Sequence, residues 1–167
     1  MKNVNTQSQP RIDYRAEQPT LGIRVQTPFR GMFKVVDGLR KELNGWLAQQ
    51  GVQPAGPPFL RYHVIDMDGE MDIEYGVPVR ERMSGDGRVE PGVLPAGRYA
   101  SLIYSGSGLQ GNRALIEWAK QNGVPFDRWD DPKGDAFRAR LETYMTDPKV
   151  EPRKTKWQVE MAVRVRD

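Results

Sequence analysis

The segment WLAQQGV (residues 46–52) recurs as WAKQNGV (residues 118–124), with Trp, Gln, Gly and Val at the same places. Each copy ends a stretch whose apolar residues recur at helical spacing. Gly51 and Gly123 fall where a left-handed residue ends a helix, and the valine after each glycine can fold back onto the last turn. The pair therefore predicts two equivalent helices in two related halves of the chain.

The apolar positions of the two expected helices have the phase of core packing. In the first helix they are Phe33, Val36, Leu39, Leu43, Trp46 and Leu47, and in the second Leu115, Ile116, Trp118 and Ala119. We expect Trp46 and Trp118 to pack in the core rather than to contact a ligand.

A second pair of segments, MDIEYGVPV (residues 71–79) and WQVEMAVRV (residues 157–165), occurs in the same order. Both alternate between apolar and polar residues, which is typical of a half-buried strand, and Glu74 and Glu160 fall on the polar face. Chance similarity of two helix ends is the alternative, but two motif pairs in one order favour an internal duplication.

Four further segments have strand character, and Asp68-Gly69 predicts a hairpin turn before residues 71–79. The segments are residues 21–29, 59–66, 97–105 and 140–147. Each half therefore reads strand, helix, strand, strand. We expect an α+β fold of two β-α-β-β halves with pseudo-twofold symmetry, in which antiparallel sheet and two main helices enclose a central groove.

The chain is long enough for one full-sized domain. We expect residues 1–10 to form a polar tail and residues 11–167 a single domain. Within it the first half covers about residues 11–79, a Gly- and Pro-rich connection about residues 80–93, and the second half about residues 94–167.

Composition excludes several classes of function. A net charge of +3 is too small to indicate nucleic-acid binding without a basic stripe. With no cysteine and one histidine, the chain offers no disulfide, no Cys- or His-rich metal site and no thiol nucleophile. No apolar run is long enough to span a bilayer, and residues 1–9 lack the apolar middle of a signal peptide. We expect a cytoplasmic protein without metal or cofactor.

Several motifs together resemble the GyrI-like small-molecule-binding domain. They are TPFRGMF, PAGPPFLRYHVID, VLPAGRYASLIYSG, ALIEWAKQNG and, most specifically, GVPV with the pattern E-x-Y-x-x-DP of LETYMTDP. The resemblance covers about residues 11–165. That family supplies the effector-binding half of many bacterial multidrug-responsive transcription regulators, so the resemblance implies its duplicated, SHS2-like fold.

The resemblance also implies a site. In relatives an aromatic groove at the pseudo-twofold axis contains a glutamate that meets cationic, planar apolar compounds; by motif that residue is Glu142. Some members are hydrolases that open the cyclopropane of DNA-alkylating antibiotics with a glutamate and a tyrosine. If this chain is an enzyme, which the sequence leaves uncertain, the catalytic pair would be Glu142 with Tyr104, or with Tyr62.

Two features depart from the family. Ser107 and Gly108 stand where relatives often have a bulky aromatic residue, which predicts a more open wall. No helix-turn-helix precedes the domain, so we expect no direct binding to nucleic acid and a protein that is not the full regulator.

Strand periodicity places Arg140, Glu142 and Tyr144 on one side and the intervening residues on the other, and either side could face the groove. A carboxylate among aromatic walls loses hydration, and a cation would relieve that cost. The expected ligand-binding residues are Glu142, Tyr62, Tyr104, Tyr144, Trp157 and Phe33.

Other polar residues have simpler interpretations. His63 follows Tyr62 and should face away from it, so we expect a structural or exposed side chain. Neither the acidic residues 127–135 nor DMDGE (residues 66–70) has the spacing of an EF-hand, and the latter is a hairpin turn.

Two main hypotheses follow. The first is a protein that senses or sequesters apolar, planar or cationic compounds, with a protein partner as a further possibility. The second is a hydrolase of reactive small electrophiles. A weaker third is inhibition of a protein target such as a topoisomerase, as the family name suggests.

Overall fold

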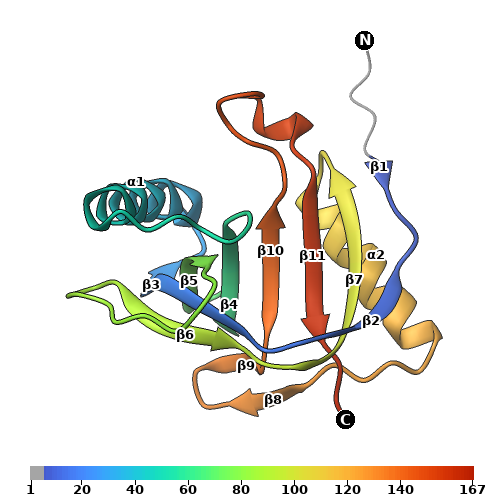
Figure 1. Cartoon of the computed structure of the whole chain (residues 1–167). Helices are drawn as coiled ribbons and strands as arrows, with labels where there is room; N and C mark the ends of the chain where they lie inside the picture. Colours follow the sequence, from blue (N-terminus) through green and yellow to red (C-terminus); the bar gives the residue numbers. More distant parts are fainter. Residues whose placement is uncertain (1–5) are drawn as a thin grey trace.

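Eleven strands and two α-helices form a curled antiparallel sheet with both helices packed against it, in a computed structural model that describes residues 6–167 (Figure 1). The first half comprises β3 (Gln18–Pro28), α1 (Met32–Gln50), β4 (Phe59–Ile65) and β5 (Glu70–Pro78). The second comprises β7 (Gly97–Ser105), α2 (Gly108–Gln121), β10 (Arg140–Tyr144) and β11 (Val159–Arg164). The expected β-α-β-β repeat is confirmed in both halves.

The two halves join into one sheet at β4 and β10. The central strand order is β7-β11-β10-β4-β5-β3, so each half contributes three strands in mirrored order. Leu141 lies opposite Arg61 and Glu142 opposite Leu60 in the antiparallel β4–β10 pair. The seam is thus a continuous hydrogen-bonded ladder, as pseudo-twofold symmetry requires.

Both helices end as their sequence repeat predicts. Gly51 and Gly123 have positive φ angles of 67° and 64°. The amide of Val52 donates to the carbonyl of Leu47 at 3.0 Å, and that of Val124 to Ala119 at 2.8 Å. Both are the 6→1 hydrogen bond of a Schellman motif, in which a glycine with positive φ ends the helix.

The apolar faces pack as two main clusters, one in each half. The alternating residues of β5 and the residue after it are buried, from Met71 to Val79, as are those of β11 from Val159 to Val165. Trp46 and Trp118 are partly buried against the first and second cluster respectively, as predicted. One position is wrong: α1 buries Met32 in place of Phe33, which is 52% exposed.

Strands outside the repeat complete the sheet. They are β1 (Thr6–Gln7), β2 (Arg11–Arg15), β6 (Glu90–Leu94), β8 (Arg128–Asp131) and β9 (Gly134–Phe137). Thr6 and Gln7 pair with β7, so the expected polar tail is ordered at its end, and residues 1–5 lie outside the described residues. The acidic residues 127–135, interpreted from the sequence as a loop without EF-hand spacing, contain β8 and the start of β9, which pair as a hairpin. Neither helix in the described part of the chain is long and apolar enough to cross a membrane.

Candidate functional site

A cavity of about 1060 Å³ lies over the seam between the two halves. Helix α1 packs against β3 and β5, whereas α2 packs against β7. The central strands β4 and β10 therefore have no helix packed directly on them, and side chains from both helices form the walls of a groove above them. This arrangement confirms the central groove expected of the duplicated fold.

Glu142 lies on the floor of this groove, within a row of apolar side chains. Its neighbours across the sheet are Met161 on β11 and Leu60 on β4, which are 1% and 0% exposed. The next residue along the row, Tyr75, is buried as well. A carboxylate in such a row has lost most of its hydration, which is costly for its charged form.

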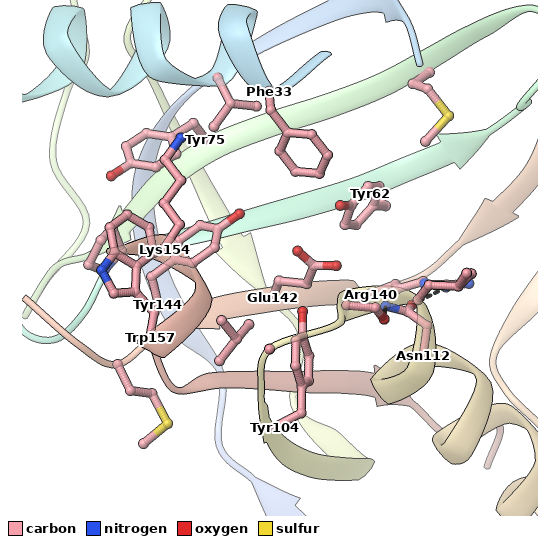
Figure 2. A pocket seen from close by; sticks show the side chains of 18 of the residues that line it. Phe33, Tyr62, Tyr75, Tyr104, Asn112, Arg140, Glu142, Tyr144, Lys154 and Trp157 are labelled. Carbon is pink, nitrogen blue, oxygen red and sulfur yellow. Dashed lines mark hydrogen bonds between the residues drawn. The ribbon is translucent and has the colours of Figure 1, made fainter. Parts of the chain in front are cut away.

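The side chains of Tyr62 and Asn112 are hydrogen-bonding neighbours of the Glu142 carboxylate. The carboxylate oxygens face the open space of the groove (Figure 2). Burial raises the pKa of Glu142 above its usual value. The Arg140 charge and the nearby Tyr62 hydroxyl and Asn112 amide oppose that rise in pKa without cancelling it. A carboxylate has about four acceptor positions, so Glu142 can accept further hydrogen bonds from a ligand beside those of its two neighbours.

Tyrosine hydroxyls surround the carboxylate. Tyr62 and Tyr104 point toward Glu142 from β4 and β7 (Figure 2). Tyr144 and Tyr104 lie in one row, on either side of Val159. Burial raises the pKa of Tyr62, Tyr104 and Tyr144, and the charge of Glu142 raises it further. These phenols therefore stay neutral and can donate hydrogen bonds to a ligand.

Two glycines of α2 make room for Tyr104. A methyl group at Gly111 would lie 2.6 Å from Cδ1 of the Tyr104 ring, and one at Gly108 would lie 3.2 Å from its hydroxyl. The first turns of α2 thus hold the ring against the groove. Gly108, one of the two residues that stand where relatives often have an aromatic side chain, lines the cavity, and the expectation of a more open wall stays a prediction.

Arg140 lies at the end of the groove nearest α2. Its Nη2 donates to Oδ1 of Asn112 at 2.8 Å, and its guanidinium lies 4.8 Å from the centre of the Phe137 ring. The Asn112 amide donates in turn to the carbonyl of Gly108 at 2.8 Å. Burial lowers the pKa of Arg140. The guanidinium is thus fixed beside Glu142 rather than free to follow a ligand.

The opposite end of the groove is aromatic. The rings of Tyr144 and Trp157 meet edge to face at 6.1 Å, and those of Phe29 and Phe33 at 6.5 Å. Trp157 precedes β11 rather than opening it, and follows the short 3₁₀ helix η1 (Lys154–Lys156). Phe33 faces the cavity because it lies one position after Met32, which begins the buried stripe of α1.

The structure gathers all six residues proposed from the sequence as ligand-binding along this one cavity: Glu142, Tyr62, Tyr104, Tyr144, Trp157 and Phe33. Their roles stay a prediction. His63 lies on the other side of β4, where its Nε2 is 2.7 Å from Oε1 of Glu74, as its strand phase predicts.

Sequence reasoning did not assign Asp37, Tyr75, Asn112, Arg140 or Lys154 to the site, although all five line the cavity. The helical spacing could have indicated some of these residues. One side of α1, next to the side that faces the core, carries residues at positions i, i+4 and i+7: Phe33, Asp37 and Arg40. Asn112 has the same relation to Ile116 on α2.

The sequence pattern of the GyrI-like small molecule binding domain matches residues 8–166. The chain belongs to this family. Among curated proteins, none matches the sequence.

Solved structures of GyrI-like and related proteins share the fold. The C-terminal domain of EcmrR is 18% identical, with a TM-score of 0.73 over 95% of this chain and 98% of that one. In the EcmrR–DNA complex, this chain spans 57% of the EcmrR chain. A hydrolase from Listeria innocua is 14% identical, with a TM-score of 0.62 over 94% of this chain and 91% of that one.

A third structure is SAV2435 bound to tetraphenylphosphonium, which is 14% identical, with a TM-score of 0.57 over 95% of this chain and 94% of that one. At these identities the likeness concerns the fold alone.

Proposed function

We propose that this GyrI-like domain binds apolar, planar or cationic small molecules in the groove between α1 and α2, for drug sensing or sequestration, with Glu142 as the anchor of the positive charge. The observation that carries the proposal is a carboxylate on the floor of an aromatic cavity whose charged form is disfavoured by burial. A cation would restore the stabilisation that Glu142 lost with its water. SAV2435, with the same fold, was solved with such a cation.

The walls favour flat apolar ligands of varied shape. Tyr62, Tyr104, Tyr144 and Trp157 offer ring faces and edges, and cation–π contact contributes about 0.5 to 2 kcal/mol per ring. Because few hydrogen bonds would fix the ligand, broad specificity follows.

Titration of wild-type protein with a cationic dye, followed by fluorescence anisotropy, tests the proposal. Glu142→Gln should weaken binding by about tenfold or more, since about 1.4 kcal/mol is lost for each factor of ten. Glu160→Gln is the matched control, because Glu160 is on the neighbouring strand β11 and pairs with Arg15 away from the cavity. Equal dye affinity in wild type and Glu142→Gln would contradict the assignment.

Hydrolysis of a reactive electrophile, such as a cyclopropane-bearing DNA-alkylating antibiotic, is the second candidate. It is favoured by the raised pKa of Glu142 together with the Tyr62 and Tyr104 hydroxyls that point toward it. Ionised Glu142 would accept a proton from water as the water oxygen bonds to a cyclopropane carbon. The ring C–C bond to that carbon would break and deliver its electron pair to a carbonyl conjugated with the ring, whose oxygen would accept a hydrogen bond from a neutral tyrosine and then the proton from Glu142.

Product formation separates the two candidates. A hydrolase requires wild-type turnover of the alkylator that is lost in Glu142→Gln and reduced in Tyr104→Phe, measured by chromatography of the ring-opened product. If the wild type binds the dye but forms no ring-opened product, the protein is a binding protein and not a hydrolase of this alkylator.

A further inference from the structure

Besides Glu142, the carboxylates of Asp37, Glu117, Asp135 and Asp147 line the same cavity, and Asp37 is the one of these that is paired with Lys154. Asp37 lies on α1, and its Oδ1 and Oδ2 are 3.3 and 3.2 Å from Nζ of Lys154, which is 117 residues further along the chain. Arg40 is a more distant partner at 3.9 Å. The ion pair thus bridges the groove from α1 to the segment between β10 and β11.

The Lys154 side chain occupies an aromatic corner of the groove. It extends among Tyr75, Tyr144 and Trp157 in Figure 2, with its ammonium toward the Asp37 end. An ammonium in this place has a carboxylate at 3.2 Å and shares its part of the cavity lining with Tyr75, Tyr144 and Trp157, the residue types that an aromatic site offers a ligand cation. Lys154 is therefore a tethered occupant of a cation subsite.

The tether is easily displaced. Lys154 is 57% exposed and Asp37 41% exposed, so water and salt screen their attraction. A cation entering this corner would exchange one partner of Asp37 for another and return the Lys154 ammonium to water.

Tyr144 and Tyr75 line the cavity together with Asp37 and Glu142. Burial raises the pKa of Tyr144, and the charges of Glu142 and Asp37 raise it further. Burial raises the pKa of Tyr75 to about 12, with the Arg40 charge opposing the rise and the Asp37 charge adding to it. Both neutral phenols can therefore contact a ligand that extends from Glu142 toward Asp37.

The size of the cavity allows both anions to be used by one molecule. Its volume of about 1060 Å³ is slightly above the range for pockets that hold a single drug-sized ligand, about 300 to 1,000 Å³. With a compact cation bound at Glu142, Lys154 would stay paired with Asp37. A longer ligand would extend to Asp37 and replace Lys154 as its partner.

We propose that Asp37 is a second cation anchor, held by Lys154 in the free protein, and that the groove takes elongated ligands with a basic group at each end. This inference rests on the proposed binding of cations at Glu142. It adds a ligand class and a specificity-determining residue to that site.

Calorimetric titration with bis(trimethylammonium)alkanes of increasing length, each compared with the alkyltrimethylammonium of equal length, tests the inference. In wild type, one length of dication should bind more tightly than its monocation. Asp37→Asn should weaken that dication by about fivefold, the effect of one screened charge pair, and leave the monocation unchanged. Lys154→Gln should strengthen the dication.

Glu42→Gln is the matched control. Glu42 is on the same helix, is 42% exposed and pairs with Arg88 at 3.3 Å outside the cavity. If Asp37→Asn and Glu42→Gln affect the dication equally, the second anchor is overturned while binding at Glu142 stands. Monocation affinity that is unchanged in Glu142→Gln would overturn the proposed function itself, and the inference with it.

Discussion

Arg140 and Glu142 project from the same face of β10 into one groove, two residues apart, with opposite charges. Asn112 fixes the guanidinium from α2. The arginine thus shares the field of the carboxylate without forming a hydrogen-bonded ion pair with it in the described residues. The groove holds its anion partly neutralised but still open to a ligand.

Replacing Arg140 should expose this balance. Because the Arg140 charge lowers the pKa of Glu142 against the effect of burial, Arg140→Gln should raise that pKa further. Carbon-detected NMR titration of the Glu142 carboxyl measures it directly. Arg113→Gln, at another lining position, is the control, and an unchanged Glu142 pKa in Arg140→Gln would contradict the relationship.

Binding of a permanently charged dye should depend on pH. The cation prefers ionised Glu142, whose pKa lies above 4.5, so affinity should fall as pH falls through that pKa and stay constant above it. In Glu142→Gln the profile should be flat. Calorimetry in buffers of different ionisation enthalpy should show proton release on binding near the pKa, and none in the variant.

Glu142 should also make the folded protein less stable at neutral pH. A carboxyl whose pKa is raised in the folded state binds protons more tightly there than in the unfolded chain. Its stabilising contribution is therefore present below pH 4.5 and is lost as pH rises through the folded-state pKa. A tenfold difference in proton affinity between the two states corresponds to about 1.4 kcal/mol.

Urea unfolding at pH 4 and pH 7.5 checks this. Glu142→Gln should exceed wild type in free energy of unfolding at pH 7.5, and the gain should shrink at pH 4. The control Glu160→Gln breaks an ion pair with Arg15 instead and should show no gain. Equal gains at both pH values would indicate that burial of the carboxylate is not the cause.

Gly111→Ala should disturb both stability and site. The added methyl group would lie 2.6 Å from Cδ1 and 2.7 Å from Cγ of Tyr104, so the ring must move. We expect a loss of about 1 to 3 kcal/mol in the free energy of unfolding, reduced by the higher helix propensity of alanine. Gly108→Ala, which meets only the hydroxyl at 3.2 Å, should cost less.

Two glycines of α1 should respond in opposite directions. Gly51→Ala forces alanine to a φ of 67° and should cost about 1 to 2 kcal/mol. Gly45→Ala, at an exposed position with open space around the added atom, should stabilise by about 0.5 to 1 kcal/mol. Thermal unfolding of both variants measures the contrast, and a stabilised Gly51→Ala would argue against the glycine-ended helix.

Periodicity and repeats were sufficient for the framework of the fold. The helix ends at Gly51 and Gly123 and the β7 boundaries follow from local rules, which act within a few residues. The β8–β9 hairpin was not predicted, because its polar sequence has no alternation and its partner β4 is distant in sequence. Phe33 belonged both to the apolar pattern of the first helix and to the expected ligand-binding residues, and only the packed helix shows that the buried stripe begins at Met32 and leaves Phe33 in the cavity.

The site was only partly accessible to such reasoning. Strand phase grouped Arg140, Glu142 and Tyr144, but which side faced the groove depended on where the helices packed. Asp37 and Lys154 meet across 117 residues, and no local pattern encodes that contact.

The β4–β10 seam has a polarity that the repeat itself lacks. Where β10 and β4 join the two halves, Glu142 on β10 lies opposite the apolar Leu60 on β4. The strand arrangement of the groove is thus symmetric, whereas its charge is not. One strand of the seam carries a carboxylate where the other carries an apolar side chain.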